Sequence, residues 1–130
     1  MNQDIRWKQR FQNFEKAFLF LKKATEYKTL DPLQAAGVIQ SFEFTFELSW
    51  KTLKDYLAVQ GIELQFPREV IKTSFQNNLI TDGQLWLEML EKRNELSHTY
   101  DDAHKDEAVR TILNSYFPAL EQVYNALRAA

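Results

Sequence analysis

The sequence predicts an all-α protein, a five-helix antiparallel up-and-down bundle with a four-helix core and one extra short helix. Only three glycines and three prolines occur among 130 residues, which is too few for the turns of a many-stranded fold. Apolar residues recur at steps of three and four over long stretches, and short breaks separate those stretches. With 45% apolar residues the chain can fill one core, so we expect a single domain over residues 1–130.

The first half of the chain predicts two long helices. The first runs from Asp4 to Tyr27, with an inward stripe made of Trp7, Phe11, Phe14, Phe18 and Leu21. Asp31 can cap the next helix, and Pro32 suits its first position. We expect this second helix to extend to Gln60 and to stop at Gly61, which readily takes the left-handed conformation of a helix end.

The second helix is predicted to be the hydrophobic centre. One apolar seam contains Ile39, Phe42, Phe46, Ser49, Leu53 and Leu57, and another contains Phe44 and Leu48. Apolar residues on more than one side indicate a helix covered from several directions. Glu43 and Glu47 are like charges four residues apart, so one of them should meet a cation. Lys51 is the local candidate and Arg93 the distant one, and a catalytic role for either carboxylate is the alternative.

A short connection at residues 62–66 leads to the extra helix, which we expect from Pro67 to Asn77. Asn77 and Asn78 suit a left-handed end. Thr81 and Gln84 match a capping box, which predicts that the fourth helix opens there and continues to about Tyr100.

The last helix is expected from about Ala103 to Leu127, because Asp101 and Asp102 offer caps and an apolar stripe follows. Pro118 lies inside this stripe. It should kink the helix or interrupt one backbone hydrogen bond.

The fourth helix carries the most informative pattern. On a helical wheel its apolar arc contains Leu85, Trp86, Leu87, Met89, Leu90 and Leu96, and Arg93 falls near the middle of that arc. Asn94 and His98 lie toward its edge. A guanidinium on a dry face is costly unless it meets a carboxylate, a phosphate or a water-filled cleft. The pattern therefore leaves open a phosphate site and an ion pair with Glu43 or Glu47.

Composition narrows the function. A net charge of −2 argues against a strongly basic, sequence-independent nucleic-acid binder, though not against an enzyme that holds one or two phosphates. There is no cysteine, and His98 and His104 lack the spacing of a helical ligand pair, so we expect no metal and no cofactor. No apolar run is long enough to span a membrane and no signal peptide is recognisable. We expect a cytoplasmic protein.

An arginine and a histidine together can cleave RNA without a metal. The imidazole can take a proton from a ribose 2′-hydroxyl or give one to the leaving oxygen, and the guanidinium can stabilise the charge on the phosphorus. Arg93 and His98 stand ~140° apart on a regular helix. One phosphate could meet both groups if the helix distorts or if two copies face each other, and the second option predicts a symmetric homodimer with a composite site. A Ser97, His98 and Asp101 hydrolase is disfavoured, because adjacent helical residues point in different directions.

The string from Arg93 to Tyr100 matches the R-x4-H-x-Y motif, with a polar residue after the arginine. Together with the aromatic helix at residues 42–57, and with the segments Pro67–Phe75 and Asp82–Trp86, it resembles the HEPN superfamily, in the branch of nucleotidyltransferase substrate-binding proteins. The resemblance implies a helical bundle that dimerises with its motifs facing each other. It further implies pairing with a small nucleotidyltransferase encoded by a neighbouring gene.

By position, the resemblance assigns phosphate binding to Arg93, acid or base catalysis to His98 and an orienting role to Asn94. It implies a toxin of a toxin–antitoxin pair, a metal-independent endoribonuclease that the partner silences by transferring AMP to Tyr100. Bulk and negative charge at that tyrosine would exclude RNA phosphate. The alternative is a non-catalytic subunit that presents a nucleotide or substrate to the nucleotidyltransferase.

Overall fold

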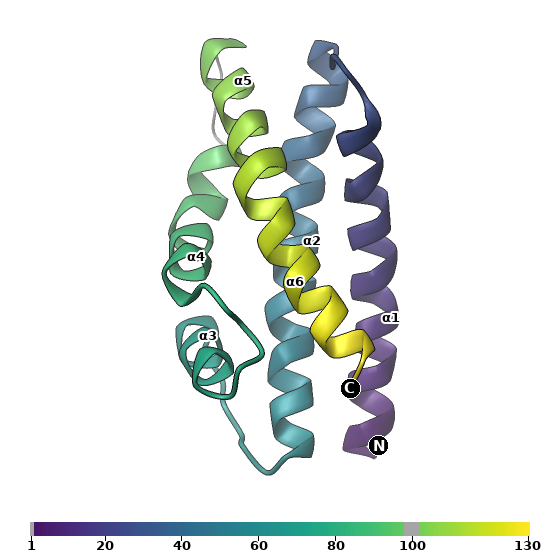
Figure 1. Ribbon diagram of the computed structural model, residues 1–130, viewed down its shortest axis with the longest axis vertical. Helices are drawn as coiled ribbons and strands as arrows, with labels where there is room; N and C mark the ends of the chain where they lie inside the picture. The colour runs from purple at the N-terminus through teal and green to yellow at the C-terminus, as the bar shows by residue number, and fades with distance from the viewer. Residues whose placement is uncertain (1, 98–101) are drawn as a thin grey trace.

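The computed structural model describes residues 2–97 and 102–130, and within these ranges it contains helices and no strand. The helical elements are α1 (Gln3–Lys22), η1 (Lys23–Glu26), α2 (Pro32–Val59), α3 (Pro67–Gln76), α4 (Gly83–Ser97), α5 (Asp102–Thr111), η2 (Ile112–Tyr116) and α6 (Phe117–Arg128). The segments α5, η2 and α6 follow one another without a break, so the described residues form the five helices that the sequence predicts. In Figure 1 the long helices run up and down, and the short α3 lies below α4, at the side of the lower half of α2.

Local chemistry explains where α2 begins and ends. Asp31 and Gln34 form a reciprocal capping box, in which the Gln34 backbone N–H donates to Asp31 Oδ1 at 2.7 Å and the Asp31 N–H donates to Gln34 Oε1 at 2.9 Å. Pro32 occupies the first turn. Gly61 takes a positive φ of 87° just beyond the helix, as expected of a left-handed end. The predicted start of this helix is confirmed, and α2 ends at Val59, one residue before the predicted end.

The N-terminus of α4 differs from the prediction. The expected capping box of Thr81 and Gln84 is wrong, because Asp82 Oδ1 accepts the Leu85 N–H at 3.1 Å and the helix begins at Gly83. The Thr81 backbone N–H instead donates to Gln122 Oε1 on α6, at 3.2 Å. The cap therefore lies one residue later than predicted, and the Thr81 N–H that Gln84 was expected to bind is paired with a distant segment.

The first helix is also shorter than predicted as an α-helix. It ends at Lys22, and the 3₁₀ turn η1 carries the chain on to Glu26. Just beyond the C-terminal end of α3, Asn78 has the expected left-handed conformation, with a φ of 62°.

The last helix continues through Pro118, which lacks a backbone N–H and so interrupts one backbone hydrogen bond, and a π-helical turn precedes it. The Phe117 N–H bonds to Ile112 O, five residues back. A proline ring crowds the carbonyl four residues earlier and removes one donor, and the wider turn gives that carbonyl room. The chain passes through η2 and continues directly as α6.

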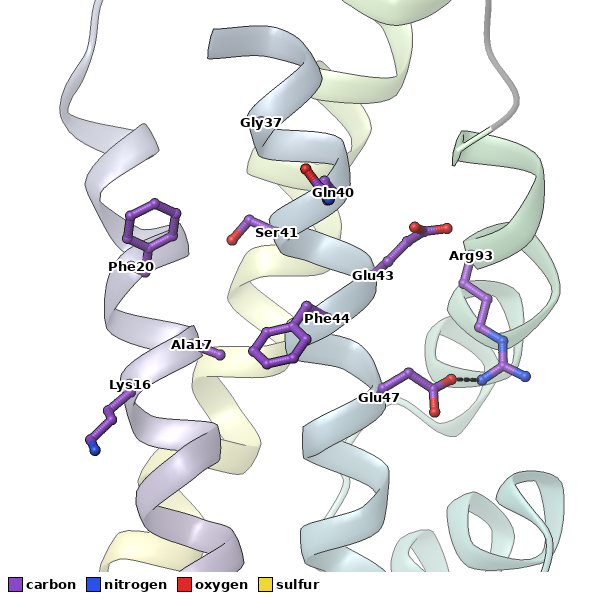
Figure 2. A pocket seen from close by; sticks show the side chains of 10 residues that line it. All are labelled: Lys16, Ala17, Phe20, Gly37, Gln40, Ser41, Glu43, Phe44, Glu47 and Arg93. Carbon is purple, nitrogen blue, oxygen red and sulfur yellow. Dashed lines mark hydrogen bonds and ion pairs between the residues drawn. The ribbon is translucent and has the colours of Figure 1, made fainter. Parts of the chain in front are cut away.

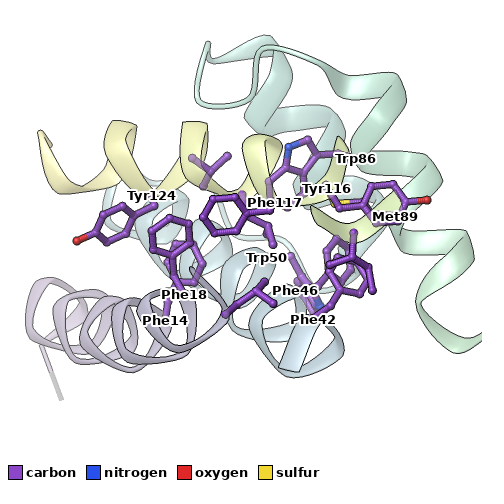
Figure 3. Close-up of a cluster of buried hydrophobic side chains, with 14 of the residues drawn as sticks. Phe14, Phe18, Phe42, Phe46, Trp50, Trp86, Met89, Tyr116, Phe117 and Tyr124 are labelled. Carbon is purple, nitrogen blue, oxygen red and sulfur yellow. The ribbon is translucent and has the colours of Figure 1, made fainter. Parts of the chain in front are cut away.

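The core lies between α2 and the other long helices (Figure 3). Its largest fully buried side chains are Phe14, Phe18, Phe42, Phe46, Trp86 and Tyr116. Burial of one such side chain contributes roughly 1.5–3 kcal/mol, so this aromatic cluster is a large part of the stabilising core. Where the first half of α1 meets the last part of α2, the buried carboxylate of Asp55 accepts a hydrogen bond from Arg10 Nε at 3.0 Å. In the described part of the chain, no helix is both long and apolar enough to cross a bilayer.

Candidate functional site

Arg93 continues the buried stripe of α4. Met89 and Trp86 lie four and seven residues before it on the same face, and both are fully buried. The Arg93 side chain is 24% exposed, so it lies at the edge of the core. Helical geometry therefore aims this cation at α2 and leaves it within reach of solvent.

The partner of Arg93 is Glu47 on α2. Arg93 Nη1 donates to Glu47 Oε1, and the guanidinium carbon lies 6.0 Å from the centroid of the Phe46 ring. Figure 2 shows the Arg93 and Glu47 side chains extended toward each other between the two helices. Of the pairings that the sequence leaves open for Arg93, this one is present in the structure.

Glu47 also has local donors. Its second oxygen, Oε2, accepts the indole N–H of Trp50 at 3.2 Å and lies 3.8 Å from Lys51 Nζ. The predicted local and distant cations are therefore both beside this carboxylate. Glu43 lies one turn earlier and is half-buried, and within the described residues its side chain has no hydrogen bond and no salt bridge. Of the two carboxylates that the sequence offers to Arg93, Glu47 is therefore the one that pairs with it.

Beside this ion pair runs an open groove of about 900 Å³ between α1 and α2 (Figure 2). Its lining comprises Lys16, Ala17, Phe20, Gly37, Gln40, Ser41, Glu43, Phe44, Glu47 and Arg93. The side chains of Phe20 and Phe44 are 65% and 61% exposed at its edges. The second apolar seam of α2, which was expected to be covered, is thus open at Phe44. A Cβ added at Gly37 would meet no atom within 4 Å.

The groove is apolar and electrically balanced. Two cations and two carboxylates line it, namely Lys16, Arg93, Glu43 and Glu47. A surface of this kind fits another protein better than a polyanion, which prefers an excess of positive charge. Sequence reasoning missed Phe20 and Gly37, although a phenylalanine off the buried stripe of its helix and a glycine inside a helix were signals that could have found them.

Several predicted site residues cannot be placed. His98 and Tyr100 lie outside the described residues, as does the side chain of Asn94, whose backbone belongs to α4. The helix that carries Arg93 is described as far as Ser97, one residue before His98. The structure thus locates the arginine of the motif, while the roles of Asn94, His98 and Tyr100 stay predictions.

A second depression, of about 400 Å³, lies between α4 and α5 and is lined by Glu88, Lys92, Glu95, His104, Glu107, Ala108, Thr111 and Tyr116. The Tyr116 hydroxyl donates to Glu88 Oε2 at 2.9 Å. Burial, helped by the hydrogen bond to that carboxylate, raises the pKa of Tyr116 above its usual value. Among the described residues, no group of three or more His, Asp or Glu side chains is arranged to hold a metal ion.

Comparison with known proteins relates this chain to a described protein family. The sequence pattern of the family described as nucleotidyltransferase substrate binding protein like matches residues 9–129. A protein named probable ribonuclease HepT, from Haemophilus influenzae, is 35% identical over 71 residues. That match covers 51% of this chain and 49% of the relative, so the aligned region spans about half the length of each protein.

Two solved structures share the fold. A crystal structure of a protein from Thermus thermophilus superposes with a TM-score of 0.80 at 34% identity, over 88% of this chain and 98% of that one. A Haemophilus influenzae protein described as the substrate binding domain of a nucleotidyltransferase superposes with a TM-score of 0.64 at 23% identity, over 98% of this chain and 99% of that one. At that identity the second likeness bears on the fold alone.

Proposed function

This chain belongs to the nucleotidyltransferase substrate-binding-like family, and from that premise we propose that it is a metal-independent endoribonuclease of the HEPN type. The observation that carries the proposal is the position of Arg93, at the edge of an open groove and held by Glu47. The name of the Haemophilus influenzae relative, probable ribonuclease, agrees with this activity.

The proposed reaction is attack of a ribose 2′-oxygen on the adjacent phosphorus. His98 accepts the 2′-hydroxyl proton or protonates the departing 5′-oxygen, while Arg93 stabilises the negative charge that develops on the phosphoryl oxygens. The P–O5′ bond breaks as the 2′-oxygen bonds to phosphorus, which leaves a 2′,3′-cyclic phosphate and a 5′-hydroxyl. In the proposal Asn94 orients these groups.

We further propose that the active form is a homodimer with a composite site. Phe20 and Phe44 leave a large apolar surface next to Arg93, and a second copy that covers it would remove that surface from water. Docking on this face would bring two Arg93 guanidinium groups toward the same symmetry axis. Each phosphate could then meet the arginine of one copy and the His98 of the other.

The proposed regulator is a small nucleotidyltransferase, the antitoxin of this toxin. It would transfer AMP from ATP to the Tyr100 hydroxyl, forming a phosphodiester to tyrosine and releasing pyrophosphate. Tyr100 is two residues from His98, so the added phosphate would compete directly with the RNA backbone.

Cleavage of labelled tRNA and mRNA in EDTA tests the activity, with Arg93→Ala and His98→Ala prepared in the same way. Both variants should lose most of the cleavage, and sedimentation should show a dimer in all three proteins. Equal cleavage by the wild type and both variants would mean that a contaminating nuclease is responsible and that the assignment is wrong.

The second candidate is a non-catalytic subunit that presents a nucleotide to the partner enzyme. The charge balance of the groove favours it, because Glu47 already compensates the Arg93 cation. A wild type that binds nucleotide but cleaves no RNA, with binding lost in Arg93→Ala, would support this candidate over the first.

A further inference from the structure

The two oxygens of Glu47 serve different donors. Oε2 accepts the indole N–H of Trp50 at 3.2 Å, and Trp50 is itself buried in the core. Oε1 accepts from Arg93 Nη1. The Glu47 carboxylate therefore connects the buried Trp50 to the Arg93 cation at the edge of the groove. The hydrogen bond from Trp50 restricts the rotation of the Glu47 side chain.

Arg93 is restrained at two points. One nitrogen is bonded to Glu47, and the guanidinium lies 6.0 Å from the centre of the Phe46 ring. A hydrogen bond at one end together with an aromatic neighbour limits the directions that a planar guanidinium can take. The remaining part of the group keeps a defined orientation at the groove.

Glu43 provides the internal comparison. It lies on the same helix and lines the same groove, yet among the described residues its side chain has no hydrogen bond or ion pair. The two carboxylates therefore add the same charge to the groove, but only Glu47 contacts the arginine.

We propose that Glu47, fixed by Trp50, is a positioning residue that holds the Arg93 guanidinium in the orientation required to contact the scissile phosphate. The inference rests on the proposed ribonuclease function. The Glu47 carboxylate then has two opposing effects on catalysis. Its charge repels phosphate and weakens RNA binding, while its hydrogen bond to Arg93 orients the group that acts in the transition state.

The first test compares Glu47→Gln with Glu43→Gln in RNA cleavage, with kcat and KM measured separately. Both substitutions remove one negative charge from the groove, so both should leave KM unchanged or lower it. Only Glu47→Gln should lower kcat, by about tenfold or more, because a small misplacement of a catalytic group has effects of that size. Trp50→Phe, which removes the indole donor, should lower kcat in the same direction by a smaller factor.

A purely structural role for Glu47 gives a different result, namely a lower melting temperature with the kcat of the folded protein unchanged. Equal kcat values for the two glutamine variants would overturn the proposal. An increase in KM as the sole effect of Glu47→Gln would overturn it as well, since that would make the residue part of substrate binding.

A second measurement does not depend on cleavage. The side-chain Nε–H signal of Arg93, identified by its loss in Arg93→Met, should show a restricted side chain in wild type and in Glu43→Gln and a mobile one in Glu47→Gln. Equal mobility in wild type and Glu47→Gln refutes the positioning role. If the wild type cleaves no RNA but this difference is present, the ribonuclease assignment fails while the orientation of Arg93 by Glu47 stands.

Discussion

The Arg93–Glu47 contact predicts a specific and modest coupling energy. The perturbation is a double-mutant cycle of Arg93→Met and Glu47→Gln, in which methionine keeps the aliphatic part of the arginine and glutamine keeps the length of the glutamate. These side chains are 24% and 37% exposed in the folded chain. A charged hydrogen bond in a protein interior contributes about 1.5–3 kcal/mol, and an exposed ion pair about 0.2–1 kcal/mol. A partly exposed pair falls between these ranges, so we expect a coupling of about 1 kcal/mol.

Chemical denaturation of the four proteins measures this coupling. For a chain of this size, 1 kcal/mol corresponds to a shift of about 4 °C in the melting temperature, which provides an independent check. Glu43→Gln in place of Glu47→Gln is the matched control, and its coupling to Arg93 should be near zero.

Both extremes of the result would contradict the reasoning. A coupling above about 3 kcal/mol is the signature of a fully buried ion pair, and it would make Arg93 a structural residue with no cation to offer a phosphate. A coupling indistinguishable from zero would mean that the two groups do not hold each other in solution, and the proposed orientation of Arg93 would lose its basis.

Three further predictions concern the rest of the molecule. Arg10→Ala should lower the free energy of unfolding by about 2–3 kcal/mol, because it removes a close partner of the buried Asp55. Arg6→Ala should lower it by well under 1 kcal/mol, because Arg6 Nε lies 3.9 Å from Asp55 Oδ1 and the Arg6 side chain is mostly exposed. Burial raises the pKa of Tyr116, so the stability that this group contributes is complete below its unfolded pKa of about 10 and is lost as pH rises further. Above pH 10 the free energy of unfolding should therefore fall more steeply in wild type than in Tyr116→Phe. The two slopes should differ by at most about 1.4 kcal/mol per pH unit. Gly37→Gln should leave the monomer at least as stable, since the added side chain meets open space, yet weaken dimerisation in sedimentation experiments, and an unchanged dimer would contradict docking on this groove.

The sequence predicted most of the fold because its signals are local. A capping aspartate before a proline sets the start of α2, and Gly61 and Asn78 take the left-handed conformations expected of them. The N-terminus of α4 was missed for a non-local reason. Thr81 and Asp82 are both acceptable caps, and the structure adds a hydrogen bond from the Thr81 N–H to Gln122 on α6, which no local pattern contains.

The candidate site was predictable only in part. The wheel placed Arg93 among apolar residues and therefore required a partner, but it could not choose between Glu43 and Glu47. That choice depends on how far α4 is shifted along α2, which is set by packing of the whole bundle. Apolar periodicity likewise showed that Phe44 is hydrophobic, without showing whether another part of the same chain covers it.

The pairing of Arg93 with Glu47 reconciles two requirements of this face. A lone guanidinium beside an apolar groove would be costly to desolvate, and a second copy docking there would increase that cost. A carboxylate contact lowers the cost and also orients the cation. Because the contact uses Oε1 alone and the other oxygen accepts the Trp50 indole N–H, the carboxylate binds the arginine through one oxygen rather than as a two-pronged clamp. One carboxylate contact lowers the cost of placing this charge beside the core, and the Arg93 side chain stays 24% exposed, so the cation remains within reach of a phosphate.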